Sequence, residues 1–325
     1  MKLIGRILLA IVGVVFLLTF GTVMYISLTQ PDVSAAPEIA IEPTMDRIAR
    51  GEYLVKHVAA CLDCHSHAEE NRFATPLVPG TEGMGGRAFT EESGFPGTLY
   101  APNITPAALR NWTDGELLRA LTVGVNRDDE AIFPSMPWGV YRHFARADLY
   151  AIIAYLRSME AKPNAVPPSE LKFPMNIIVR MMPSDVTLRE SRPDTAETVA
   201  YGEYMAQVAG CAYCHTQSDK GAPVPGTEFG GGQGFGLPHG VVYSANITPD
   251  VETGIGSWTE AQWLERFYRY RDGQNTPVIE AGEFQTVMPW THYAGMTDRD
   301  LLAIFAYLQT VAPIRNTVER FVPHN

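Results

Sequence analysis

Two short cysteine motifs with the same spacing stand out in the chain of 325 residues: Cys61-Leu62-Asp63-Cys64-His65 and Cys211-Ala212-Tyr213-Cys214-His215. Two cysteines at this spacing can form a redox dithiol or half of a zinc site. A histidine directly after the second cysteine changes the chemistry, because two thiols can add to the vinyl groups of a haem while the imidazole reaches its iron from the same turn. All four cysteines lie in these motifs. We therefore predict two covalently bound c-type haems, with a pair of zinc sites as the alternative.

The iron ligands follow from the same motifs. His65 and His215 are the predicted proximal ligands, and an iron that only passes electrons needs a sixth ligand on its other face. Met136 and Met288 are the candidates, because each is followed by Pro-Trp in a loop and each lies at nearly the same distance beyond its own histidine. A thioether would favour the reduced iron and raise its potential. The alternatives are a repeated core methionine and ligation by His143 or His292 of the same loops.

Further residues are predicted to surround the haems. The second ring nitrogen of each histidine should donate to a carbonyl, and the loop prolines Pro79 and Pro225 are candidates to supply it. Two asparagines occupy the same position in a repeated Asn-Ile-Thr sequence, where we expect them to hydrogen-bond a haem propionate together with a nearby tryptophan. These residues are Asn103 with Trp112 and Asn246 with Trp258. A turn stabilised by Asn and Thr side chains is the alternative.

Each motif opens a unit that occurs twice in the sequence. Each unit contains, in order, a Gly-Glu-Tyr segment before the motif, Pro-Gly-Thr-Glu, Tyr-x-x-Asn-Ile-Thr-Pro, Trp-Thr, Met-Pro-Trp and a closing Asp-Leu…Tyr-Leu segment. The pattern predicts mostly α-helical units. A first helix ends in the motif, a second starts at Thr113 or Thr259 with a capping box, and a last helix presents an apolar stripe from Leu149 or from Leu301. We expect that last helix to pack on the first, with Gly51 and Gly202 permitting a close crossing.

The amino terminus carries an uncharged apolar run over residues 7–28, preceded by Lys2 and Arg6. A run of this length can span a bilayer as one helix, and the basic residues before it predict a cytoplasmic start. A cleaved signal peptide is the alternative, although its apolar core is normally shorter. We predict a single-pass anchor in the cytoplasmic (inner) membrane of a bacterium, with the haem domains on the periplasmic side.

The domain organisation follows from these features. We predict an anchor over 1–28, a tether over 29–45, a first domain over 46–160, a proline-rich linker over 161–193 and a second domain with a short tail over 194–325. The apolar centre of the linker, 173–182, is expected to cover the interface between the domains. The composition is that of a globular protein, with 46% hydrophobic and 19% charged residues. A net charge of −11 disfavours nucleic acid as a partner.

The order of these motifs resembles the cytochrome c subunits of bacterial membrane-bound dehydrogenases that act on alcohol, gluconate, sorbitol or fructose. The resemblance covers about residues 46–313. It implies haem attachment at the four cysteines, axial pairs His65/Met136 and His215/Met288, and the class I cytochrome c fold for each domain. It also implies an electron-transfer subunit rather than an enzyme, with redox protein partners: a dehydrogenase catalytic subunit and the respiratory chain. The alternatives are a tethered donor to a terminal oxidase and a dihaem peroxidase, which would need an open iron.

Overall fold

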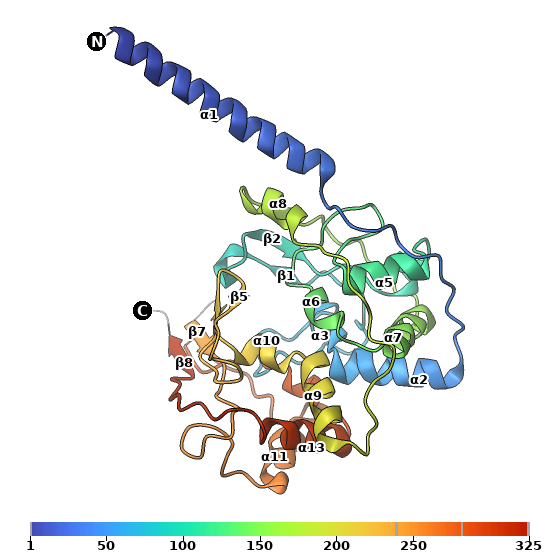
Figure 1. Cartoon of the computed structure of the whole chain (residues 1–325). Coiled ribbons are helices and arrows are strands. Elements are labelled where there is room, and N and C mark those ends of the chain that lie inside the picture. Colours follow the sequence, from blue (N-terminus) through green and yellow to red (C-terminus); the bar gives the residue numbers. More distant parts are fainter. Residues whose placement is uncertain (1, 238–239, 281, 324–325) are drawn as a thin grey trace.

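The chain folds into a mostly helical body from which one long helix projects (Figure 1). The computed structural model describes residues 2–237, 240–280 and 282–323. Helix α1 (Lys2–Thr29) confirms the apolar helix predicted at the amino terminus. Within the described ranges, it is the one helix long and apolar enough to cross a membrane. Met1 of the predicted anchor and residues 238–239, 281 and 324–325 of the predicted second domain lie outside the described residues.

Five α-helices recur in the same order in two units, called here the first unit (residues 45–158) and the second unit (residues 198–308). The first unit contains α2 (Met45–Tyr53), η1 (Leu54–Val58), α3 (Cys61–Cys64), η2 (Glu91–Ser93), α4 (Pro106–Leu109), α5 (Asp114–Thr122), α6 (Trp138–Tyr141) and α7 (Arg146–Ser158). The second unit contains α9 (Thr198–Val208), α10 (Cys211–His215), α11 (Glu260–Tyr268), η4 (Arg271–Gly273), α12 (Trp290–Tyr293) and α13 (Asp298–Leu308). The predicted order of helices is therefore present in both units.

The first and last helices of each unit cross closely. Helix α2 packs on α7, and α9 packs on α13. A Cβ atom on Gly51 would collide with the carbonyl oxygen of Ala151, and one on Gly202 would collide with that of Ala303. The predicted apolar stripes of α7 and α13 are buried at these crossings. The expectation that two glycines permit the crossings is confirmed.

The second helices are capped as the sequence predicts. Thr113 accepts a hydrogen bond from the backbone N–H of Glu116, and the Glu116 side chain accepts one from the backbone of Thr113. Thr259 and Gln262 form the same capping box on α11. These reciprocal bonds satisfy two of the unpaired donors at a helix start, so α5 and α11 begin at equivalent residues.

The first unit contains a π-helix that has no counterpart among the described residues of the second unit. One more residue separates Tyr53 from Cys61 than separates Tyr204 from Cys211. In the longer stretch, η1, the N–H of Ala59 bonds to the carbonyl of Leu54 at 2.8 Å. A π-turn inside a helix takes up an extra residue without ending the helix, so the cysteine motif follows the first helix in both units.

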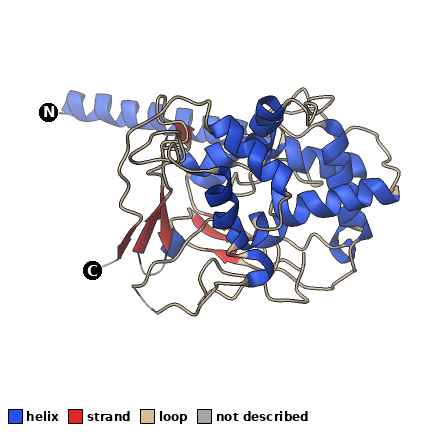
Figure 2. Cartoon of the chain, turned by 90° about the horizontal axis from the view of Figure 1, so that it is seen from below, coloured by secondary structure: helices blue, strands red, loops and turns tan. Residues whose placement is uncertain are grey.

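Short strands close the loops around the helices (Figure 2). One antiparallel sheet joins β1 (Ala88–Phe89), β2 (Gly97–Tyr100) and β3 (Glu170–Leu171), and another joins β6 (Gly234–Leu237), β7 (Gly240–Tyr243) and β8 (Phe321–Pro323). A small hairpin pairs β4 (Ser218–Asp219) with β5 (Ala222–Pro223). The linker thus supplies β3 and the predicted tail supplies β8, so both segments are held against a unit.

The centre of the linker forms α8 (Met175–Ile178) and η3 (Val179–Met181). These two short helices contact α1 and each other, and α8 also contacts β3. The expectation that this apolar segment covers the interface between the units is wrong. The interface is already filled by helices of the two units, and the linker centre lies beside the end of α1 instead (Figure 1).

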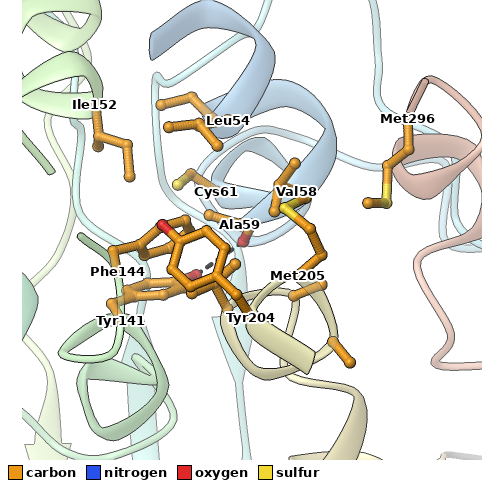
Figure 3. Packing of buried hydrophobic residues seen from close by; sticks show 14 of the residues in the cluster. Leu54, Val58, Ala59, Cys61, Tyr141, Phe144, Ile152, Tyr204, Met205 and Met296 are labelled. Carbon is orange, nitrogen blue, oxygen red and sulfur yellow. Dashed lines mark hydrogen bonds between the residues drawn. The ribbon is translucent and has the colours of Figure 1, made fainter. Parts of the chain in front are cut away.

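The two units exchange equivalent hydrogen bonds. The hydroxyl of Tyr53 on α2 donates to Asp300 of α13 at 2.5 Å, and the hydroxyl of Tyr204 on α9 donates to Asp148 of α7 at 2.8 Å. Each hydroxyl also accepts a hydrogen bond from the backbone N–H directly before the helix that it contacts. Thr297 before α13 donates to Tyr53, and Ala145 before α7 donates to Tyr204. Figure 3 shows Tyr204 and its neighbour Met205 packed against the core of the first unit. One hydrophobic core therefore runs through both units.

Candidate haem-binding sites

Both cysteine motifs lie on a tight helical turn that follows a residue with left-handed backbone. Ala60 has φ 47° before α3, and Gly210 has φ 73° before α10. The reversal separates each motif from the preceding helix and turns it inward. His65 and His215, which follow the second cysteines, are both buried. The predicted proximal ligands are thus held inside the protein rather than on its surface.

Each proximal histidine is oriented by a backbone carbonyl. The Nδ1 atom of His65 lies 2.7 Å from the carbonyl oxygen of Pro102, and that of His215 lies 2.7 Å from the carbonyl oxygen of Ala245. With Nδ1 as the donor, Nε2 carries the free lone pair that a metal needs. Burial lowers the pKa of His215 to about 4, against the opposing effect of that carbonyl, so the ring is neutral at ordinary pH. Burial also lowers the pKa of His65.

The predicted source of these carbonyls, Pro79 and Pro225, is wrong. Both prolines lie in turns that precede the strands, where each is followed by a glycine with positive φ. The carbonyls belong instead to Pro102 and Ala245. Each lies two positions after the end of a strand, β2 or β7, so the two carbonyls occupy equivalent positions in the two units. The repeated Tyr-x-x-Asn sequence could have indicated them, because Pro102 and Ala245 directly precede its asparagine.

The asparagines hold the loops together. The Oδ1 atom of Asn246 accepts hydrogen bonds from the N–H and hydroxyl of Thr248, and its Nδ2 donates to the carbonyl of Ile314 at 2.6 Å and to Thr253 at 2.9 Å. Both amide hydrogens of Asn246 therefore already have acceptors within the chain. Asn103 makes the same bonds to Thr105 and donates to a carbonyl after α7. The geometry favours the alternative, a turn stabilised by Asn and Thr side chains.

A cavity in the second unit brings most of its predicted site residues together. Its volume is about 420 Å³, within the usual range for cofactor pockets. Cys211, His215 and Met288 all line it, so a thiol, an imidazole and a thioether face one space. The predicted residues Asn246 and Trp258 line it as well. The donor set and the apolar walls fit a covalently attached haem.

Aromatic residues that the sequence analysis did not single out also line this cavity. Trp263 closes it from α11 and fixes its indole by a hydrogen bond of 2.8 Å to the carbonyl of Leu301. Trp290, directly after Met288-Pro289, stacks on Tyr270 with ring centroids 5.2 Å apart. Apolar rings of this kind exclude water from a cofactor and lower the local dielectric.

The methionine loop of the first unit has the same backbone geometry as that of the second. The N–H of Trp138 bonds to the carbonyl of Met136 at 2.7 Å, and the N–H of Trp290 bonds to that of Met288 at the same distance. Met136 is half-buried and packs on the shared core, as does Trp112. The equivalence of the two loops supports Met136 as the counterpart of Met288.

A tyrosine that the sequence analysis gave no role joins each methionine loop to the cysteine turn of the same unit. The hydroxyl of Tyr141 donates to the carbonyl of Ala59 at 2.8 Å, and the hydroxyl of Tyr293 donates to that of Ala209 at 2.5 Å. Each acceptor lies two residues before a first cysteine, and each tyrosine lies five residues after a methionine. We call this pair the loop tyrosines. Their signal was present in the sequence as a repeated Met-Pro-Trp-x-x-Tyr.

Neither alternative histidine ligand lines the cavity of the second unit. His143 is exposed. His292 is buried, with its Nδ1 2.9 Å from the carbonyl oxygen of Lys56 in the first unit, and His57 reaches back to the carbonyl of His292 at 3.0 Å. These contacts turn His292 toward the other unit. They favour methionine over histidine as the sixth ligand.

Among the described residues, the four cysteines are not grouped with further side chains as zinc ligands would be. Burial raises the pKa of Cys61, Cys64 and Cys211 to about 12, and that of Cys214 to about 11. Across the part of the chain that the structure describes, no group of three or more His, Cys, Asp or Glu side chains is arranged to hold a metal ion. The zinc alternative is therefore disfavoured.

Comparison with known proteins agrees with this chemistry. Residues 199–312 match the family model for cytochrome c. The chain is 26% identical over 302 residues to the alcohol dehydrogenase (quinone) cytochrome c subunit of Gluconacetobacter polyoxogenes, covering 86% of this chain and 59% of that protein. It is 27% identical over 298 residues to a dihaem cytochrome c-type protein of Cereibacter sphaeroides, covering 88% of this chain and 93% of that protein. A stretch of 117 residues is 36% identical to the gluconate 2-dehydrogenase cytochrome c subunit of Pantoea cypripedii, covering 36% of this chain and 24% of that protein.

Proposed function

We propose that this chain, which carries a cytochrome c domain over 199–312 and is similar to cytochrome c subunits of dehydrogenases, is a membrane-anchored dihaem cytochrome c that transfers electrons. The observation that carries the proposal is the cavity in the second unit, where Cys211, His215 and Met288 face one space. The repeat extends the assignment to the first unit and makes the two units tandem class I cytochrome c domains. The axial pairs are His65/Met136 and His215/Met288.

The ligand sets favour electron transfer over catalysis. A c-type haem, when bound, supplies an iron that changes its oxidation state by one electron. Cys211 and Cys214 would hold it covalently, His215 would bind the iron from one side and Met288 from the other. Such a set leaves no open position for a substrate. The tryptophans around the cavity exclude water, and Trp112 and Trp258 stay candidates for contacts with the propionates.

Electrons would pass between the two units without a diffusional encounter. The units share one hydrophobic core, and α9 of the second unit contacts α6 of the first. Two sites fixed in one body keep a constant separation, so transfer within the chain would not depend on protein concentration.

The similarity to dehydrogenase subunits supports a catalytic dehydrogenase as the electron donor and the respiratory chain as the acceptor. The first relatives are longer than this chain, which spans 59% of their length. Helix α1, with Arg6 before its apolar run, supports a single-pass anchor with the haem units on the periplasmic side of the inner membrane. A donor subunit of a terminal oxidase would use the same two sites.

Purification from bacterial membranes in mild detergent tests the partner. With an affinity tag at the carboxyl terminus, we expect a dehydrogenase catalytic subunit to co-purify, and we expect its substrate to reduce both haems of the chain. Recovery of oxidase subunits instead would support the oxidase assignment. A pure chain that no dehydrogenase substrate reduces in intact membranes would contradict the proposed donor.

A further inference from the structure

The linker presents an apolar patch to the outside. Phe173 is 74% exposed, Met181 is 50% exposed and Ile178 is 36% exposed. These three residues, called here the linker patch, lie on or beside the short helices α8 and η3. Val179 between them is buried and fixes the segment to the body. Three large apolar side chains exposed within one short segment of the chain favour a binding partner there.

The linker patch is attached to the end of α1. Helices α8 and η3 both contact α1, and Figure 1 shows α8 beside the carboxyl-terminal end of that helix. The Arg180 side chain donates to the carbonyl of Ser27 at 3.3 Å. Val23, Ile26 and Ser27 are half-buried by these contacts, whereas residues 3–22 of the helix are exposed. The patch is therefore held at one level along α1.

That level corresponds to the surface of a bilayer. The hydrocarbon core of a membrane is about 30 Å thick, which about 20 helical residues span. Arg6 is the last charged residue before the apolar run of α1. If the core begins just after Arg6, it ends close to Ile26, which is where α8 and η3 meet the helix. The linker patch then lies at the outer boundary of the hydrocarbon.

We infer that the linker patch inserts into the outer leaflet of the membrane that α1 spans. This inference rests on the proposed membrane anchor. Lipid is the partner that fits, because α1 already holds the patch at the bilayer surface and no further encounter is needed. Two attachments would fix the orientation of the body.

Spin labelling of the full chain tests the inference. All four native cysteines would be consumed by haem attachment, so one added cysteine would be the unique free thiol. The variants are Phe173→Cys in the patch, Tyr25→Cys on α1 as the lipid control, and Val251→Cys on the second unit as the water control. Tyr25 and Val251 are 65% and 68% exposed, which matches Phe173. Each labelled protein, with its haems reduced, is placed in vesicles of phosphatidylethanolamine and phosphatidylglycerol.

The readout is the collision rate of each label with oxygen, which concentrates in lipid, relative to a water-soluble nickel chelate. We expect this ratio at Phe173→Cys to exceed that at Val251→Cys several-fold and to approach that at Tyr25→Cys. A ratio equal to that at Val251→Cys would overturn the inference while leaving the anchor intact. Shielding from both reagents would also overturn it, since a protein would then cover the patch. Water exposure at Tyr25→Cys would overturn the anchor itself. Ile178→Cys replaces Phe173→Cys if that variant does not fold.

Discussion

At the scale of single residues, the loop tyrosines determine how each methionine loop is held. Tyr141 is buried and Tyr293 is half-buried, and desolvation, with the nearby cysteines, raises the pKa of both hydroxyls well above the ordinary value. The hydroxyls therefore stay protonated and can donate to the carbonyls of Ala59 and Ala209 over the whole working pH range. Each bond links the loop that carries a methionine to the turn that carries the cysteines.

We predict that Tyr293→Phe loosens the methionine ligand of the second unit. Loss of one buried hydrogen bond should cost about 1 kcal/mol of stability. Met288 should then detach at a lower pH than in the parent protein, which is measured as earlier loss of the methionine-to-iron charge-transfer band in an alkaline titration. Tyr100→Phe, a half-buried tyrosine away from the methionine loops, is the control. An unchanged titration in Tyr293→Phe would show that the hydroxyl does not position the loop.

The sequence predicted some of these residues and missed others for physical reasons. Cysteine and histidine chemistry is local, because one turn holds the whole motif, and this made His65 and His215 identifiable. The methionines were found through the repeat. The carbonyls of Pro102 and Ala245 belong to chain segments that β2 and β7 bring to the histidines, and short strands of this kind leave no periodic pattern. Backbone acceptors also have no residue type by which to recognise them.

At the scale of helices, the crossings of α2 with α7 and of α9 with α13 depend on glycine. We predict that Gly202→Ala pushes α9 away from α13 and lowers the free energy of unfolding by about 1–3 kcal/mol. Gly139→Ala is the matched control, since an added Cβ there meets nothing within 4 Å. Urea unfolding followed by circular dichroism measures both. Equal stability of the two variants would contradict the close crossing.

The tyrosine–aspartate exchange between the units is a second feature at this scale. Burial raises the pKa of Asp148, but hydrogen bonds from Arg50 and Tyr204 and the charge of Arg50 outweigh it, so the pKa lies below its usual range. A carboxyl pKa below its unfolded value of about 3.9 stabilises the fold above that pH, and this stability is lost as the pH falls further.

We therefore predict that Asp148→Asn destabilises the protein by about 2 kcal/mol at pH 7, because charged hydrogen bonds are lost. The difference from the parent protein should shrink as the pH falls below about 4. Urea unfolding at a series of pH values measures it, with the exposed Asp128→Asn as the control. A difference that stays constant down to pH 3 would show that the Asp148 charge does not act in this way.

The helices were more predictable than the segments between them. Capping boxes at Thr113 and Thr259 and the apolar stripes of α7 and α13 carry strong local signals. In the sequence, the only signal for the π-helix η1 is that the stretch before the cysteine motif is one residue longer in the first unit than in the second. The position of the linker centre was predicted wrongly, because apolar residues indicate burial but do not identify the segment that buries them. Its true neighbour, α1, is more than a hundred residues away in the sequence.

At the scale of the whole molecule, one apolar helix projects from a body with a single continuous core. We predict that deletion of residues 2–29, with export restored by a cleavable signal peptide, releases the protein into the soluble periplasmic fraction. The visible spectrum should not change, because the haem units do not depend on α1. Carbonate extraction of membranes should leave the full chain in the pellet. A full chain that carbonate releases would contradict the anchor.

The central claim is that the chain holds two closed, six-coordinate haem irons. An optical and redox titration of the purified full chain tests it most directly, with Met136→Ala, Met288→Ala and the control Met84→Ala. We predict two low-spin haems per chain with a methionine-to-iron charge-transfer band. That band should fall by about half in Met136→Ala and in Met288→Ala, with one potential lowered in each, and it should be unchanged in Met84→Ala. A band that survives intact in both axial variants, or a chain with one haem, would contradict the claim.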